Sequence, residues 1–424
     1  MRFYALLFLL LANLAAKELP PELNRIVDLA AKAPPEYGAA ALLDVAARLP
    51  AKEKLPYLVR AFELAASGSP QVGVERQAEA VLALVPLDPA LARELFGRIH
   101  PKSPGPLSCT ADSVPPESYG LAIRLVSERT FTPEERLKGD HVRLLVEYLA
   151  TVTAPQQIQP SVVGLTAEEL AEVAYAVAGA LGRLQTDDRT FTLTLKKLSN
   201  EVQALHASLS GSARVELAAA WRKYLVNHLK GKRCSSASPE EIEVIQTYNS
   251  SLVTEDSRTQ PIAKEETDGE RMDKAEDPNA KDVQKWSERF RSLMFANGGG
   301  LPRSTDQKQT VVWQREFDAI VAEVEGTRRN DGESESSFLL RKANGYRVLA
   351  FAAAEDRKAA LIQDFAAFLA GSPVRTEDPA LWTKVVASSY SIDAVRFREA
   401  FERSGDPLLL LQSALLSLPP RPAI

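Results

Sequence analysis

The chain of 424 residues is too long for one ordinary hydrophobic core, because single cores stop growing well below that length and longer chains divide into domains. Its content of 45% hydrophobic and 25% charged residues is that of a folded protein and excludes global disorder. At a formal net charge of -5 the chain lacks the overall positive charge that attracts phosphate backbones, so we expect no nucleic-acid partner.

Residues 1–16 have the layout of a secretory signal peptide. Arg2 gives a positive start, an apolar run follows, and Ala15 and Ala16 precede a polar segment. This run is too short to span a bilayer comfortably and no second run of spanning length follows, so we expect no permanent membrane anchor after cleavage. A buried or an uncleaved N-terminal helix is the alternative. The mature protein is therefore predicted to be exported, either to the periplasm or to the outside of the cell.

Residues 17–253 are predicted to form a helical-hairpin domain. Their apolar residues recur at spacings of three and four, the period of amphipathic helices, with hardly any strict alternation. Thr166 with Glu169, and Ser238 with Glu241, have the spacing of capping boxes and mark two helix starts. Short helices with short turns favour a stack of hairpins that share apolar faces. The repeats are unequal, so we predict an all-α fold, an irregular α-solenoid-like stack followed by a flexible linker and a smaller helical body.

One predicted hairpin carries a resemblance. Residues 33–46 read APPEYGAAALLDVA, and residues 55–62 read LPYLVRAF. This pair of segments resembles a hairpin in uncharacterised exported all-helical bacterial proteins. The resemblance covers a small fraction of the chain and implies no activity.

Residues 254–310 are predicted to be a flexible linker, since their first half is highly charged and almost free of large apolar residues. Within the linker, a helix near residues 282–295 would place Trp286, Phe290 and Leu293 on one apolar face. We interpret this helix as a mobile docking element for a partner. Packing of the helix on one of the chain's own helical bodies is the alternative.

Residues 311–424 are predicted to form a second helical body. Asp378 and Asp406 each precede a proline, the pattern of a capping residue before the first helical position. The final run, residues 408–418, is apolar on all sides, which predicts a core helix. A docked tail or an exposed partner site is the alternative.

The two cysteines are the expected crosslink. Cys109 and Cys234 fall in predicted loops, and export would place them where disulfides persist. Closing so long a loop would stabilise the fold by about 4–5 kcal/mol on the chain-entropy model. Two unpaired thiols are the alternative.

No residue pattern predicts catalysis, a cofactor or a metal site. The four histidines, at positions 100, 141, 206 and 228, lie outside any zinc-binding helix motif, and no phosphate-cradling glycine loop occurs. Asp140 and His141 are interpreted as part of a solvated helix face rather than as a catalytic pair.

Architecture without catalytic motifs favours an exported scaffold that binds a protein or peptide on the concave face of its helical stack. The alternative is a cell-envelope enzyme of an all-helical class, resembling the helical superhelix that accompanies lytic transglycosylases, with an isolated glutamate as general acid. Convergent carboxylates in a cleft would favour the enzyme, and a broad groove would favour the binding protein.

Overall fold

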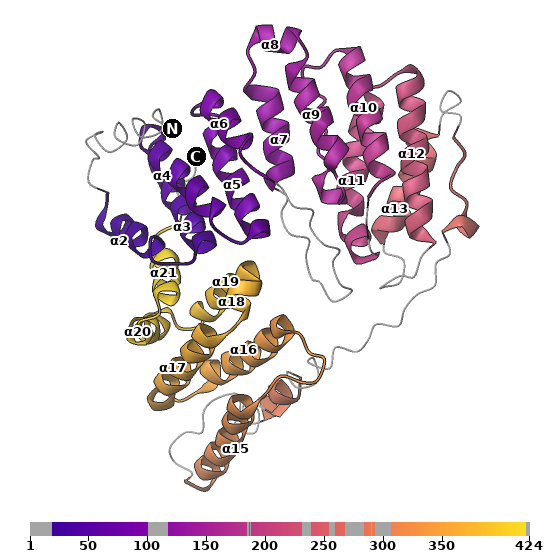
Figure 1. The fold of residues 1–424 in the computed structure, drawn as a ribbon. Helices are drawn as coiled ribbons and strands as arrows, with labels where there is room; N and C mark the ends of the chain where they lie inside the picture. The colour runs from indigo at the N-terminus through magenta and orange to yellow at the C-terminus, as the bar shows by residue number, and fades with distance from the viewer. Residues whose placement is uncertain are drawn as a thin grey trace. The chain divides into compact units, whose positions relative to one another are not determined.

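The computed structural model describes residues 19–100, 118–184, 186, 188–230, 239–253, 259–267, 284–289, 291–292 and 307–420. In these ranges every regular element is a helix and no strand occurs, which confirms the all-α prediction. The chain divides into two compact units (Figure 1). Unit 1 combines residues 1–48 with 275–424, and unit 2 comprises residues 49–274.

Unit 2 is built from helices that contact neighbours close in the sequence. Its helices are α4 (Ala51–Ala66), α5 (Pro70–Leu84), α6 (Pro89–Phe96), α7 (Ser118–Arg129), α8 (Pro133–Leu137), α9 (Asp140–Thr151), α10 (Ala167–Leu181), α11 (Asp188–Ala207), α12 (Gly211–Leu229) and α13 (Pro239–Thr247). Unit 2 also contains two short 3-10 helices, η1 (Pro155–Gln157) and η4 (Lys264–Glu266), and one π-helix, η2 (Tyr248–Leu252). Helix α4 contacts α5, α5 contacts α7, α7 contacts α9, α9 contacts α10, and α10 contacts α12. The last four of these helices stand side by side in Figure 1.

The start of α10 shows how local sequence sets these elements. The Glu169 amide donates to Thr166 Oγ1 over 3.3 Å, and the Thr166 amide donates to Glu169 Oε2 over 2.8 Å. This is the predicted capping box, which satisfies donors that a helix start leaves open. A second box, Thr132 with Glu135, begins α8. Ser238 of the other predicted box lies outside the described residues.

Unit 1 joins both ends of the chain. Its helices are α2 (Pro21–Ala30), α3 (Pro35–Arg48), α15 (Gln307–Gly326), α16 (Glu335–Ala352), α17 (Glu355–Gly371), α18 (Val374–Glu377), α19 (Pro379–Tyr390), α20 (Ala394–Ser404) and α21 (Pro407–Leu416). Both predicted aspartate caps form, because Asp378 accepts from the Leu381 amide and Asp406 accepts from the Leu408 and Leu409 amides. The apolar helix α21 is in the core, as predicted: Leu408, Leu409 and Leu411 are buried.

The two units differ from the two consecutive domains predicted at residues 17–253 and 311–424, because α2 and α3 belong with the C-terminal helices. Helix α21 contacts α2, α3 and α19, so its apolar surface is covered from both ends of the chain. The physical reason is that apolar periodicity marks a face to be buried but does not say which distant helix will cover it.

Aromatic and polar contacts fix this closure. The Tyr37 ring lies 5.7 Å from the fully buried Trp382 ring in an edge-to-face arrangement. The Tyr37 hydroxyl donates to the Arg375 carbonyl over 2.7 Å, although 338 residues separate the two. The Arg375 guanidinium in turn donates to the Asp406 carboxylate over 2.9 Å. Helix α3 is thereby tied to the α18–α21 region.

Residues 259–267 of the predicted linker are held on unit 2 by one buried residue and several hydrogen bonds. Ile262 is buried, and both its amide and its carbonyl hydrogen-bond the Asn249 side chain. Arg222 of α12 forms a salt bridge with Glu266 at 2.8 Å and donates to the Gln260 carbonyl. One buried isoleucine and one arginine therefore hold residues 259–267, which composition alone assigned to solvent.

Candidate functional site

A groove of about 310 Å³ lies in unit 2 between α10 and α12. The two helices contact each other and bury large side chains from both, among them Val177, Leu217 and Trp221. Small residues line the groove outside that core: Ala178 and Gly182 come from the α10 side, and Ala219 and Ala220 come from α12. Because these residues carry little or no side chain, the surface between the helices stays hollow.

Charged groups lie along one side of the groove. Glu216 and Lys223 both line it and are exposed. They are seven residues apart on α12, which places them about two turns, or roughly 10 Å, apart along the helix axis. The groove therefore offers one acidic and one basic contact at a defined spacing.

An aromatic cluster closes one end of the groove. The His228 ring lies 4.6 Å from the Tyr224 ring and stacks on Phe191 at 5.3 Å. Burial raises the pKa of the Tyr224 phenol, so the tyrosine stays neutral at physiological pH. Tyr224 and His228 line the groove together with Asn227. The groups accessible at this end are the half-buried His228 ring and the exposed Asn227 side chain, because Tyr224 itself is buried.

The groove was not predicted from the sequence. A run of three alanines, Ala218–Ala220, was the available signal, because alanine on the outer rows of a helix leaves room for another chain. That signal is weak, since alanine is also the best helix-forming residue.

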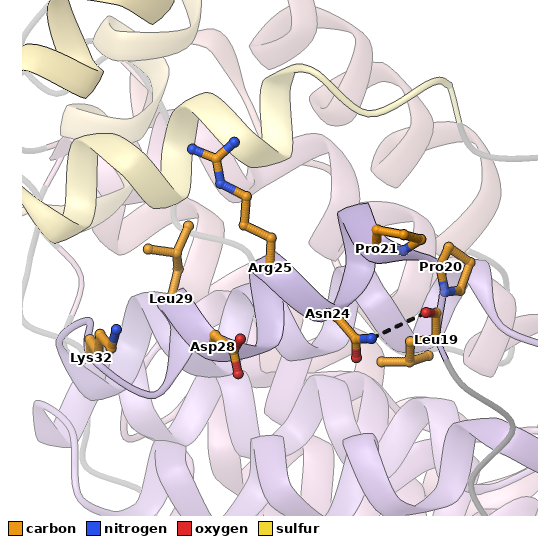
Figure 2. Close-up of a pocket in the computed structure, with 8 residues that line it drawn as sticks. All are labelled: Leu19, Pro20, Pro21, Asn24, Arg25, Asp28, Leu29 and Lys32. Carbon is orange, nitrogen blue, oxygen red and sulfur yellow. Dashed lines mark hydrogen bonds between the residues drawn. The ribbon is translucent and has the colours of Figure 1, made fainter.

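A larger depression, of about 790 Å³, lies along α2 in unit 1 (Figure 2). Its described lining comes from α2 and the residues just before and after it, and the Asn24 side-chain amide donates to the Leu19 carbonyl over 3.2 Å. Among the described residues no second helix contributes groups to it, so they do not form the convergent lining that is typical of a binding site.

The prediction that His141 lies on a solvated helix face is wrong. His141 is only 2% exposed, whereas the sequence favoured a solvated helix face. Its Nε2 lies 3.7 Å from Glu169 Oε1, and burial together with the nearby Arg136 lowers its pKa. A neutral imidazole buried beside one carboxylate is a structural arrangement that the helical period around Asp140 did not reveal.

Glu75 is the described carboxyl group whose pKa is raised. Burial raises it more than the hydrogen bonds from Ser118 lower it. The Ser118 amide donates to Glu75 Oε2 over 2.7 Å, so this carboxylate accepts from the first residue of α7. Glu75 does not line the α10–α12 groove.

The predicted docking helix is helical at residues 284–289 and 291–292. Trp286 is 4% exposed, and a side chain on Gly345 of α16 would meet its ring. Arg289 forms salt bridges with Glu316 at 2.7 Å and with Glu323 at 2.5 Å, both on α15. These contacts are those expected for packing on the chain's own body. Phe290 and Leu293 lie outside the residues whose side chains are described.

Cys109 and Cys234 also lie outside the described residues, so their pairing stays a prediction. Within the described ranges, no group of three or more His, Cys, Asp or Glu residues is placed to hold a metal ion. No helix in those same ranges is long and apolar enough to cross a membrane.

Comparisons of this chain with protein-family models, with curated proteins and with solved structures gave no match.

Proposed function

We propose that this chain is an exported scaffold protein that binds a peptide segment of a partner in the α10–α12 groove. The observation that carries the proposal is the groove itself: small residues from two contacting helices leave a trough flanked by charges and ended by aromatic rings. Grooves of this kind bind chains through many modest contacts rather than through a reacting group. Export rests on the signal-like residues 1–16 alone.

The helix order in unit 2 supports the interaction role. Helices α7, α9, α10 and α12 contact one another in chain order, as in stacks of helical hairpins that present extended binding surfaces. We therefore include a solenoid-like arrangement of unit 2 in the proposal.

The charges define the peptide class. An extended peptide advances about 3.3 Å per residue, so Glu216 and Lys223 are spanned by roughly three residues. We expect a bound peptide to place a basic side chain near Glu216 and an acidic group near Lys223. Between them, small apolar side chains would fill the trough above Ala219 and Ala220.

The test is selection of short peptides from a displayed library on the full chain, followed by affinity measurement. A double reversal, Glu216→Lys with Lys223→Glu, should weaken the selected peptides at least tenfold and select peptides of the opposite charge order. Reversing Lys197, an exposed lysine on α11 outside the groove, serves as the matched control. Ala220→Trp should abolish binding by filling the trough.

Peptides that bind the wild type and the double-reversal variant equally would place recognition elsewhere and end the proposal. A helical circular dichroism spectrum and an unchanged Tm for each variant would show that lost binding reflects the groove and not the fold.

The enzyme alternative has one residue in its favour. Glu75 has the raised pKa that a general acid requires, although its carboxylate already accepts from the Ser118 amide. Incubation with cell-wall polymer, using wild type and Glu75→Gln, separates the two functions. Polymer cleavage that disappears in the variant would favour the enzyme over the scaffold.

A further inference from the structure

A small cavity in unit 1 lies where the N-terminal α2 meets the C-terminal α20 and α21. Its volume is about 120 Å³, which is roughly the volume of four water molecules in the liquid. The basic side chains of Arg25 and Arg398 and the hydroxyl-bearing Ser413 and Ser417 line it. Two guanidinium groups and two serines thus meet at one cavity, from segments that are hundreds of residues apart in the sequence.

Arg25 is only loosely held by its own protein partner. Its side chain extends from α2 toward the C-terminal helices, drawn in yellow in Figure 2. It contacts Glu402 of α20 at 3.5 Å, and the two side chains are 56% and 47% exposed. Exposed pairs of this kind contribute little to stability, so Arg25 can exchange Glu402 for another anion at little cost.

Arg398 interacts mainly with the Tyr390 hydroxyl and more weakly with the Glu402 carboxylate. Burial raises the pKa of Tyr390, but hydrogen bonds with Ser417, Arg398 and Ser413 together lower it below its ordinary value. The Ser417 hydroxyl donates to the Ser413 carbonyl over 2.7 Å and lies 3.0 Å from the Tyr390 hydroxyl. Since a guanidinium has five N–H donors, the contact with Tyr390 leaves most of those of Arg398 for a ligand.

We propose that this cavity binds a small oxyanion, a phosphate or carboxylate group, between Arg25 and Arg398. Guanidinium groups recognise such groups through paired N–H donors, and two of them from different helices can clamp one anion from both sides. Glu22 also lines the cavity and, with Glu402, balances the two positive charges while no anion is bound. The bound anion replaces that balance.

Binding links the two ends of the chain. Arg25 belongs to α2, whereas Arg398 belongs to α20, so an anion between them braces the contact of α2 with the C-terminal helices. A ligand that binds only the folded state raises the apparent stability in proportion to the logarithm of its concentration.

The experiment is titration of the full chain with inorganic phosphate, and separately with acetate, at constant ionic strength set by sodium chloride. Binding is followed by calorimetry, and the Tm is measured at each concentration. We expect the Tm to rise with one of the two anions beyond the chloride baseline. Arg25→Gln and Arg398→Gln should each raise the dissociation constant at least tenfold.

Two further variants keep the test sharp. Glu22→Gln removes an acidic group from the cavity wall and should tighten binding severalfold, a gain that misfolding cannot produce. Arg403→Gln changes an arginine on α20 that pairs with Glu399 outside the cavity, and it should leave binding unchanged.

A response to phosphate that depends on both arginines identifies a phosphate group as the ligand, and the same response to acetate identifies a carboxylate. The proposal is overturned if neither anion binds above the chloride baseline, or if Arg25→Gln and Arg398→Gln bind as tightly as Arg403→Gln.

Discussion

The two units bury their cores in different ways. In unit 2, each helix from α4 to α12 contacts helices one or two places along the chain. In unit 1, by contrast, α2 and α3 contact α21, which lies more than 350 residues further along the sequence. The first arrangement is assembled from local contacts, whereas the second must close nearly the whole chain into one loop.

The two arrangements should distribute stability differently. In a local stack, a substitution should lower hydrogen-exchange protection only near its own site, because each helix depends mainly on its neighbours. In a closed unit, a substitution should lower hydrogen-exchange protection in the N-terminal and the C-terminal helices together. The loss of protection caused by a substitution should therefore extend over different helices in the two units.

The largest effect is expected from the buried tryptophans. Trp382→Ala in unit 1 and Trp221→Ala in unit 2 each remove a side chain that is at most 1% exposed, and each should cost about 3–5 kcal/mol. Hydrogen exchange by mass spectrometry should show faster exchange in α2 and α3 only for Trp382→Ala. Unchanged exchange in α2 and α3 would mean that the Trp382 contact does not hold the N-terminal helices.

Within unit 1, the buried salt bridge between Arg341 and Glu333 joins residues that are only 8 positions apart in the sequence. Arg341 donates to Glu333 Oε1 over 2.9 Å and to Oε2 over 2.6 Å, and both side chains are 1% exposed. Glu333→Gln leaves a buried charge poorly paired and should cost about 3 kcal/mol.

The loss of hydrogen-exchange protection caused by Glu333→Gln should be confined to α15 and α16. The exposed Arg403–Glu399 pair gives the control, since Glu399→Gln should cost under about 0.5 kcal/mol. Equal effects of the two variants would show that the burial of the first pair contributes nothing.

Gly345→Ala tests whether residues 284–292 are part of unit 1. A Cβ at Gly345 would lie 3.0 Å from Trp286 Cζ3 and 3.0 Å from both Val324 methyl groups, so it is confined from two sides. We expect a loss of about 2 kcal/mol from this overpacking. Gly326→Ala, where a Cβ meets open space, should be neutral or slightly stabilising. A neutral Gly345→Ala would support a partner-docking role for Trp286 instead.

Sequence reasoning succeeded where a few adjacent residues decide the structure. The box at Thr166 and the aspartate caps at Asp378 and Asp406 were predicted because each depends on residues within one turn. It failed where the deciding partner is distant. Nothing near Tyr37 specifies Arg375, and nothing in the alanines of α12 specifies that α10 lies beside them. The groove could therefore be identified only from the structure, although its charged residues can be read from the sequence.

Acid should affect unit 2 at higher pH than unit 1, because the two histidines with lowered pKa values, His141 and His206, both lie in unit 2. Burial and the nearby Arg214 lower the pKa of His206 to about 4, against about 6.5 in the unfolded chain. The unfolded chain therefore binds more protons between these values. The contribution of His206 to stability is complete above pH 6.5 and is lost as the pH falls toward 4.

We expect unit 2 to lose about 1–2 kcal/mol from this source between pH 7 and pH 5. In unit 1, Glu333 and Asp393 have lowered pKa values because hydrogen bonds to arginine outweigh burial, so their contributions are lost only below about pH 4.5. Thermal unfolding at several pH values, with hydrogen exchange to separate the units, measures both. A variant His206→Gln that keeps the same pH dependence would assign the effect to other groups.

The smallest effect is expected from removing either of two hydrogen bonds, each from a tyrosine hydroxyl to a backbone carbonyl. Tyr37 donates to the Arg375 carbonyl over 2.7 Å, and Tyr148 donates to the Gln157 carbonyl over 2.8 Å. Both side chains are buried, but the first bond spans 338 residues and the second spans 9. Replacing either tyrosine by phenylalanine removes one hydroxyl, keeps the ring and leaves a buried carbonyl short of a donor, at a cost of about 1 kcal/mol.

The two variants should lower the free energy of unfolding equally and differ in where the loss occurs. Tyr148→Phe should speed exchange only around α9 and η1, because its partner lies in the adjacent turn. Tyr37→Phe should speed exchange both in α3 and in the segment from α18 to α21, because the lost bond joined the two ends of unit 1. If exchange after Tyr37→Phe changed in α3 alone, α18–α21 would be stable without α3, and the closure would be a contact between two independent parts rather than one cooperative unit.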